Sequence, residues 1–163
     1  SCSKLYYADL EGCTTSSVTD MSQWFMGCTN LRELNLSGWN TSSVNSMTSM
    51  FDGCTRLEKI YVSTFVTAMA SSSNNMFYGC TSLTKAPELP AKTLVFSCYY
   101  RMFYGCKNLN NITMLATNIS ADYCLDTWVN GVASTGTFTK ASAMTSLPSG
   151  TSGIPEGWTV VNK

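Results

Sequence analysis

Apolar positions recur along this chain with a fixed period of 26 residues. The motif that shows the period is an apolar residue followed by Phe, a variable residue, Gly and Cys, and its phenylalanines are Phe25, Phe51, Phe77 and Phe103. A period of about 20–50 residues is typical of a solenoid, in which each repeat is one structural unit that stacks on its neighbours. The period therefore predicts a stack of similar rungs.

The period divides the chain into five rungs and a tail. The predicted rungs are residues 2–27, 28–53, 54–79, 80–105 and 106–131. Residues 132–163 form the predicted C-terminal cap, since a terminal repeat needs a segment that covers its open core. Within this cap, residues 135–139 (Thr-Gly-Thr-Phe-Thr) are expected to form one last strand. The chain starts inside the pattern with no visible signal peptide, which predicts a mature, trimmed or fragmentary chain.

The first part of each rung has the pattern of a strand. It reads Cys-x-x-Leu-x-x-apolar-x-apolar, and the second rung shows it most clearly with Leu31, Leu34 and Leu36. Because side chains alternate between the two faces of a strand, residues 34 and 36 share one face. The sequence thus predicts a parallel sheet that receives one strand from each rung.

The later part of each rung changes to a helical spacing. Val44, Met47 and Met50 are separated by steps of three, which is one apolar stripe of a short helix. Residues 41–43 (Thr-Ser-Ser) are suitable helix N-caps, and Gly53 can end the helix in a left-handed conformation. The stripe is lost in the Ser- and Asn-rich residues 68–75. The predicted fold class is an α/β solenoid, a right-handed superhelix with a parallel sheet on one face and short helices or turns on the other.

The fourth rung departs from the others in its strand. Residues 86–90 read Ala-Pro-Glu-Leu-Pro. Proline has no N–H group to donate, so the pairing of this strand is expected to be local and irregular.

Composition excludes several classes of protein. Hydrophobic residues make up 44% of the chain, which argues against disorder. The formal net charge is zero, so there is no electrostatic case for binding nucleic acid or an anionic membrane. No apolar run approaches the roughly 18–20 residues that a membrane-spanning helix needs.

The eight cysteines raise the question of a metal site or a disulfide. Five form one column of the repeat, Cys2, Cys28, Cys54, Cys80 and Cys106. A buried turn position in such a repeat accommodates a free thiol, which packs as a small apolar group. Structural zinc needs four converging ligands, whereas this column is linear. The remaining alternative is a disulfide between Cys98 and Cys124, which lie one period apart. We expect buried free thiols, no metal site and no cofactor.

Catalysis has little support in the residue types present. The chain has no histidine, which is the usual general base near neutral pH. Asp9, Glu11 and Asp20 cluster in the first rung, but a solvated acidic edge explains them. We expect no catalytic residues.

The exposed face of the predicted sheet is the best candidate for binding. Strand residues that lie between the buried ones project from this face in columns. Aromatic side chains dominate the energetics of interfaces, and the expected anchors are Tyr7, Tyr61 and Leu89. The alternative is a plain solvated face with charge pairs such as Glu33 with Lys59. The predicted partner-binding residues are Tyr7, Glu33, Asn35, Lys59, Tyr61, Lys85 and Leu89.

Three stretches resemble a known family. Residues 34–44 (Leu-Asn-Leu-Ser-Gly-Trp-Asn-Thr-Ser-Ser-Val), with the Met-Phe-x-Gly-Cys run at 50–54, resemble the BspA-like leucine-rich repeats of bacterial surface proteins. Residues 86–106 look like a second form of this repeat that is common in gut Bacteroides-type proteins. Residues 136–160 are similar to a C-terminal cap that recurs there.

The resemblance implies a leucine-rich-repeat solenoid at the bacterial cell surface or secreted, with a role in adhesion or host interaction and no catalytic residues. The predicted function is a non-catalytic interaction module, monomeric, that binds a protein or glycan on a host or neighbouring cell. The alternative is a structural spacer or stalk segment of a larger surface protein, with no ligand of its own.

Overall fold

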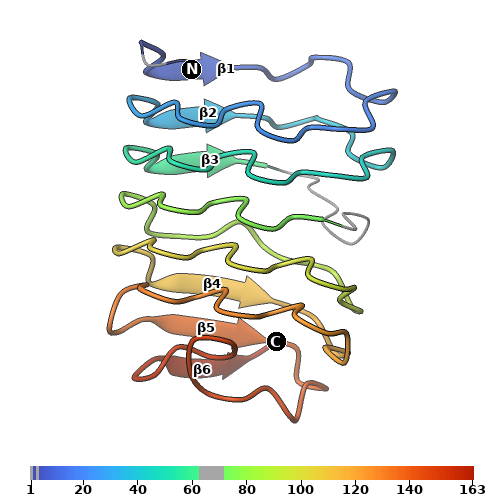
Figure 1. The fold of residues 1–163 in the computed structure, drawn as a ribbon, viewed down its shortest axis with the longest axis vertical. Coiled ribbons are helices and arrows are strands. Elements are labelled where there is room, and N and C mark those ends of the chain that lie inside the picture. Colours follow the sequence, from blue (N-terminus) through green and yellow to red (C-terminus); the bar gives the residue numbers. More distant parts are fainter. Residues whose placement is uncertain (1, 3, 63–71) are drawn as a thin grey trace.

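The structure is a computed structural model that describes residues 2, 4–62 and 72–163. In this part of the chain the backbone forms a parallel β-solenoid whose rungs are stacked along one axis (Figure 1). The strands are β1 (Tyr7–Asp9), β2 (Glu33–Asn35), β3 (Lys59–Tyr61), β4 (Asn111–Met114), β5 (Thr137–Lys140) and β6 (Thr159–Asn162). They form two three-stranded parallel sheets, in the orders β1-β2-β3 and β4-β5-β6.

The register of the strands confirms the 26-residue period. Leu34 of β2 pairs with Ala8 of β1 and with Ile60 of β3, and each partner lies one period away. The strand expected at residues 135–139 is present as β5, which pairs with β4. β6 then adds a further strand through pairs such as Phe138 with Val160. The tail therefore continues the sheet, while the position of the cap boundary at residue 131 stays a prediction.

The expectation of short helices was wrong for the part of the chain that the structure describes, where the face opposite the sheet consists of turns. Residues 68–71 of the segment expected to lose the apolar stripe lie outside the described residues. In a helix every N–H is directed along the chain's own axis to a carbonyl four residues earlier. Here the N–H groups alternate between two directions.

The second rung shows this alternation. The amides of Met50 and Asp52 donate three residues back within the rung, to the carbonyls of Met47 and Ser49. The amide of Phe51, which lies between them, donates to Met76 on the next rung at 2.9 Å. Ser49 has a positive φ of 53°, a left-handed conformation that breaks a helix. Consecutive turns thus leave every second amide free to join neighbouring rungs.

Threonine joins adjacent rungs where helix N-caps were expected. Thr15 is buried, and its hydroxyl donates to the carbonyl of Asn40 and accepts from the amide of the same residue, at 3.0 and 2.9 Å. Thr41 is buried at the equivalent position of the second rung. The Thr-Ser-Ser segments are therefore turns whose threonine side chains belong to the interior.

A column of stacked phenylalanines fills the core. Phe25, Phe51, Phe77 and Phe103 have exposed fractions of 8%, 0%, 1% and 0%. Their ring centroids are 5.5, 5.0 and 5.5 Å apart in that order, and the rings are nearly parallel. This confirms the predicted alignment of the repeat. Trp24, which precedes the first of them, is 44% exposed because its rung is the terminal one of the described stack.

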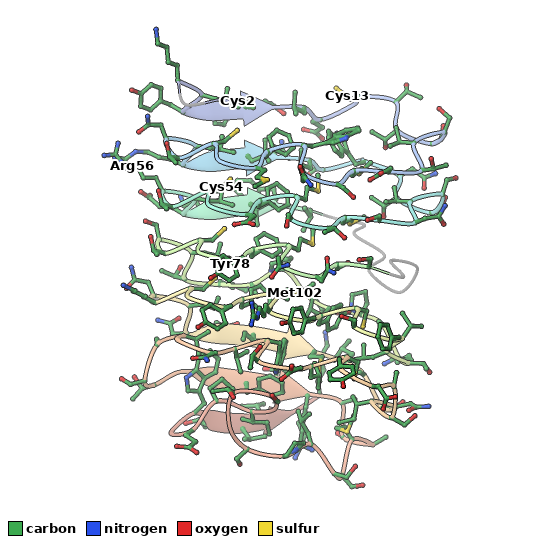
Figure 2. All side chains as sticks on the ribbon, in the orientation of Figure 1. Cys2, Cys13, Cys54, Arg56, Tyr78 and Met102 are labelled. Atoms are coloured by element: carbon green, nitrogen blue, oxygen red, sulfur yellow. The ribbon has the colours of Figure 1, made fainter. Side chains whose placement is uncertain are left out.

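A column of thiols runs beside the phenylalanines. The Sγ of Cys54 donates to the carbonyl of Phe25 at 3.0 Å, and the Sγ of Cys80 donates to that of Phe51 at 3.1 Å. Burial raises the pKa of Cys54 to about 12, so its thiol stays protonated at neutral pH. Cys2 and Cys54 lie one above the other on the same side of the stack (Figure 2).

The expectation of buried free thiols is confirmed for four members of this column and was wrong for Cys2. Cys28, Cys54, Cys80 and Cys106 are fully buried, whereas Cys2, in the first rung that the structure describes, is exposed. The cysteines at 98 and 124, one period apart, are buried and are free thiols rather than a disulfide.

Candidate functional site

Most of the predicted partner-binding residues lie together on the solvent face of the strands. In the first column Tyr7 pairs with Glu33, and Glu33 pairs with Lys59. In the second column Asn35 pairs with Tyr61. Tyr7 and Tyr61 are 53% and 45% exposed.

Charged and polar side chains near Tyr7 on this face affect its pKa. Partial desolvation raises the pKa of the Tyr7 hydroxyl, and Asp9, Glu33 and Tyr61 nearby raise it further. The tyrosines, the glutamate and the aspartate therefore share one surface. Tyr7 and Tyr61 are its large exposed side chains.

Leu89 does not belong to this surface, because it is buried with an exposed fraction of 1%. The prediction assumed a constant 26-residue offset, which holds for the bridge between Lys85 and Asn111. The offset then falls to 25 at the bridge between Leu89 and Met114. One additional residue in the fourth-rung strand moves Leu89 from the exposed column to the core-facing one, since side chains alternate along a strand.

The same irregular strand interrupts the sheet. Within the described residues, β3 pairs only with β2, and the fourth-rung strand at residues 84–89 makes its bridges to the fifth rung. Pro87 lies one period after Tyr61 of β3. Tyr61 itself pairs with Asn35 of β2. Because proline lacks an N–H, it cannot donate to β3 there. The irregular pairing expected from the prolines is confirmed.

The interruption leaves main-chain groups of both strands directed at each other without pairing. The amide of Lys59 donates back to Arg32 on the second rung, so the groups of the next residue, Ile60, are directed toward the fourth rung. The amide of Ala86 donates forward to Asn111, so the groups of Lys85 are directed toward the third rung. In the part of the chain that the structure describes, no backbone hydrogen bond joins β3 to residues 84–88.

A cleft lies at this interruption. Its volume is about 430 Å³, and its walls are β3 with its flanking residues on one side and residues 84–88 on the other. The predicted residues Lys59, Tyr61 and Lys85 all line it. Ile60 is half-buried at its base, whereas the equivalent Leu34 is fully buried. The interruption therefore exposes apolar core surface beside exposed polar side chains. In Figure 1 the backbone between β3 and β4 is drawn without strand arrows.

The charges around the cleft do not balance locally. Glu58 is paired with Arg32 at 2.9 Å, and Glu88 is paired with Lys163 at 2.7 Å. Lys59 and Lys85 line the same cleft, and neither has an ion-pair partner among the described residues. Glu33, which lies beside Lys59 in the strand register, is not within ion-pair distance of it. Two lysines thus remain available to an anionic group.

Two acidic residues of the first rung, Asp9 and Asp20, act as turn caps. The Oδ1 of Asp20 accepts from the amide of Ser22 at 2.7 Å, and the hydrogen bonds from Ser22 lower the pKa of Asp20. The Oδ1 of Asp9 accepts from the amide of Glu11 at 3.1 Å. Across the described ranges, no three His, Cys, Asp or Glu side chains are grouped so that they could hold a metal ion. Nor do these ranges contain a helix long and apolar enough to cross a membrane.

Sequence reasoning placed Lys59, Tyr61 and Lys85 on the correct face but did not identify the cleft. It missed the contribution of Ile60, which the regular pattern assigns to the buried core. It also missed Glu88, whose side chain lies on the cleft wall. Pro87 was the available signal, because a proline inside a strand pattern marks a missing donor.

Comparison with known proteins gives a match to a family model and a similarity to a solved structure. A family model described as "Mycoplasma protein of unknown function, DUF285" matches residues 1–117. No curated protein matches the chain. Among solved structures, the chain is similar to the crystal structure of the T. pallidum leucine-rich-repeat protein TpLRR, with 17% sequence identity and a TM-score of 0.48. The alignment covers 83% of this chain and 59% of the other, so this chain spans about three fifths of that protein's length.

The specific resemblance to BspA-like repeats stays a prediction. The family match includes the first four predicted rungs and extends through β4. Since it covers well over half of the sequence, the chain belongs to the DUF285 family.

Proposed function

We propose that this chain is a non-catalytic interaction module that binds a protein or glycan partner through the exposed face of its strands. The observation that carries the proposal is the cleft beside β3, where Lys59, Tyr61 and Lys85 meet at an interruption of the sheet. We further propose that the module acts as a monomer at the surface of a bacterial cell or secreted from it, in adhesion to a host or neighbouring cell.

The size and lining of the cleft support a binding role. Its volume of about 430 Å³ lies within the range of about 300–1,000 Å³ that is common for ligand sites. Tyr61 offers an aromatic anchor that is 45% exposed, and exposed aromatic side chains on one face are the usual source of interface energy. The sequence contains no histidine, and the carboxylates of Asp9 and Asp20 are engaged in turns, which favours binding over catalysis.

A structural spacer remains the second candidate, and one observation favours it. Val160 and Val161 of β6 are 44% and 43% exposed on a strand with one sheet partner in the described structure. At the opposite end Trp24 and Met26 are 44% and 47% exposed. Apolar residues at both ends of a stack are suited to contacts with further segments of a stalk.

The replacement Tyr61→Ala distinguishes these candidates. If Tyr61 is an anchor, its loss should weaken binding about fivefold or more, because truncation of an anchor residue costs more than about 1 kcal/mol. The measurement is a binding screen of matrix proteins and glycans, followed by titration of every hit with both forms of the chain.

Tyr123→Ala is the matched control, since Tyr123 is 63% exposed but lies away from the strands in a turn. Equal affinity of wild type and Tyr61→Ala for every hit would remove Tyr61 from the proposed site. A screen without any hit would favour the spacer.

A further inference from the structure

We propose that the cleft between β3 and residues 84–88 binds an extended acidic peptide, which adds to the free edge of β3 and places carboxylates beside Lys59 and Lys85. This inference rests on the proposed interaction role and names its partner class. The main-chain groups of the cleft and the alternation of residues along its walls distinguish a peptide from other anions, and the charge of the cleft favours an acidic one.

The main-chain groups favour a peptide. Ile60 directs an N–H and a C=O toward the cleft, and no residue of the fourth rung pairs with them in the described structure. A free strand edge presents donors and acceptors at the spacing of another polypeptide backbone. Addition of an extended peptide to such an edge is a common mode of recognition, in which the main chain supplies affinity and alternate side chains supply specificity. A glycan or a simple anion would satisfy the lysines but would not complete this ladder.

The unbalanced charge selects an acidic peptide. Both glutamates of the cleft walls are engaged, Glu58 by Arg32 and Glu88 by Lys163. Lys59 and Lys85 are exposed on opposite walls. A carboxylate bound between two lysines gains attraction from both, and such charge complementarity steers association and suppresses wrong partners. A basic peptide would meet repulsion at the same place.

Solvent-facing and core-facing residues alternate along each wall of the cleft, and this alternation defines the order of side chains in the peptide. The lysines belong to the solvent-facing column, whereas Ile60 and Ala86 face the core and lie at the base of the cleft. Successive side chains of an extended peptide point to opposite faces. The matching sequence therefore alternates acidic residues, which face the lysines, with apolar residues, which cover Ile60.

The test uses a fluorescein-labelled peptide of alternating glutamate and valine, Glu-Val-Glu-Val-Glu-Val-Glu, titrated with the full chain in fluorescence polarisation. The expected result is saturable binding that the double variant K59E/K85E weakens by about tenfold or more, since both ion pairs become repulsive. The control variant K92E/K107E makes the same change in net charge at exposed lysines outside the cleft and should bind like wild type. A peptide with lysine in place of glutamate should not bind.

Two further probes separate backbone pairing from simple charge attraction. Peptides N-methylated at alternate residues lose the N–H groups of one edge, so one of the two alternate sets should abolish binding and the other should not. An oligosaccharide of alternating uronate residues carries carboxylates without a peptide backbone. Equal binding of this oligosaccharide with the same dependence on Lys59 and Lys85, or no effect of either N-methylation, would overturn the peptide assignment.

The outcome is separable from that of the proposed function. If the acidic peptide does not bind while another partner from the screen binds in a Tyr61-dependent manner, the acidic-peptide inference is overturned and the interaction role stands. If neither the peptide nor any screened partner binds, both are rejected in favour of the spacer.

Discussion

Replacement of Phe77 by alanine is expected to lower the free energy of unfolding by about 3–5 kcal/mol, the usual range for loss of a buried phenylalanine ring. Phe77 is 1% exposed and stacks between Phe51 and Phe103, with centroid separations of 5.0 and 5.5 Å. The ring therefore contacts an aromatic neighbour on each side along the stack. Because a solenoid rung contacts only its neighbours, the resulting cavity interrupts the core at the join of three rungs.

Phe96→Ala is the matched control for this measurement. Phe96 is 64% exposed, and substitution of an exposed side chain usually changes stability by no more than about 0.5 kcal/mol. Both variants would be compared with wild type by guanidinium denaturation followed by circular dichroism. A loss below about 1 kcal/mol for Phe77→Ala would contradict the stacked column.

Trp128→Ala should lower the free energy of unfolding by a similar amount, about 3–5 kcal/mol, in the C-terminal part of the core. Trp128 is fully buried, and its ring centroid lies 6.0 Å from that of Phe103 and 6.1 Å from that of Phe138. Its Nε1 donates to the carbonyl of Gly153 at 2.9 Å. The substitution therefore leaves both a cavity and a buried carbonyl without its donor, and an unsatisfied buried group adds to the loss.

The control for Trp128 is Trp24→Ala, which removes the same side chain at a position that is 44% exposed. Trp128→Phe should restore part of the stability by filling the cavity, but not the hydrogen bond to Gly153. Equal stability of Trp128→Ala and Trp24→Ala in denaturant titrations would show that residues 132–163 do not pack on the fifth rung through this tryptophan.

The period of the sequence was sufficient to predict the stack and most of its core. Met47, Met50 and Phe51 are all buried, as their apolar spacing requires. The same spacing did not identify the secondary structure, because it reports which side chains face the core and not where the N–H groups are directed. The residue type does not indicate the left-handed conformation of Ser49, since this conformation is uncommon for residues other than glycine. Turns and a short helix therefore predict the same pattern of buried residues.

The candidate site was predictable only in part, for a different reason. Lys59 and Tyr61 follow from the regular alternation of β3, which obeys the period. Leu89 and the cleft depend on one residue added to the strand of the fourth rung, while the rung keeps its total length. A fixed period conceals such a local shift, because the phenylalanines on either side remain 26 residues apart. Pro87 indicated that pairing would fail, but not that the failure would expose Ile60.

The central claim is that rungs one period apart are joined by direct backbone hydrogen bonds, and through-hydrogen-bond scalar coupling in nuclear magnetic resonance tests it most directly. The amide nitrogens of Phe51, Phe77 and Phe103 should couple to the carbonyl carbons of Met76, Met102 and Trp128, since these donor–acceptor distances are 2.9, 2.9 and 2.8 Å. Coupling of the Phe51 amide to the carbonyl of Met47, four residues earlier, is the pattern of an α-helix and would contradict the account.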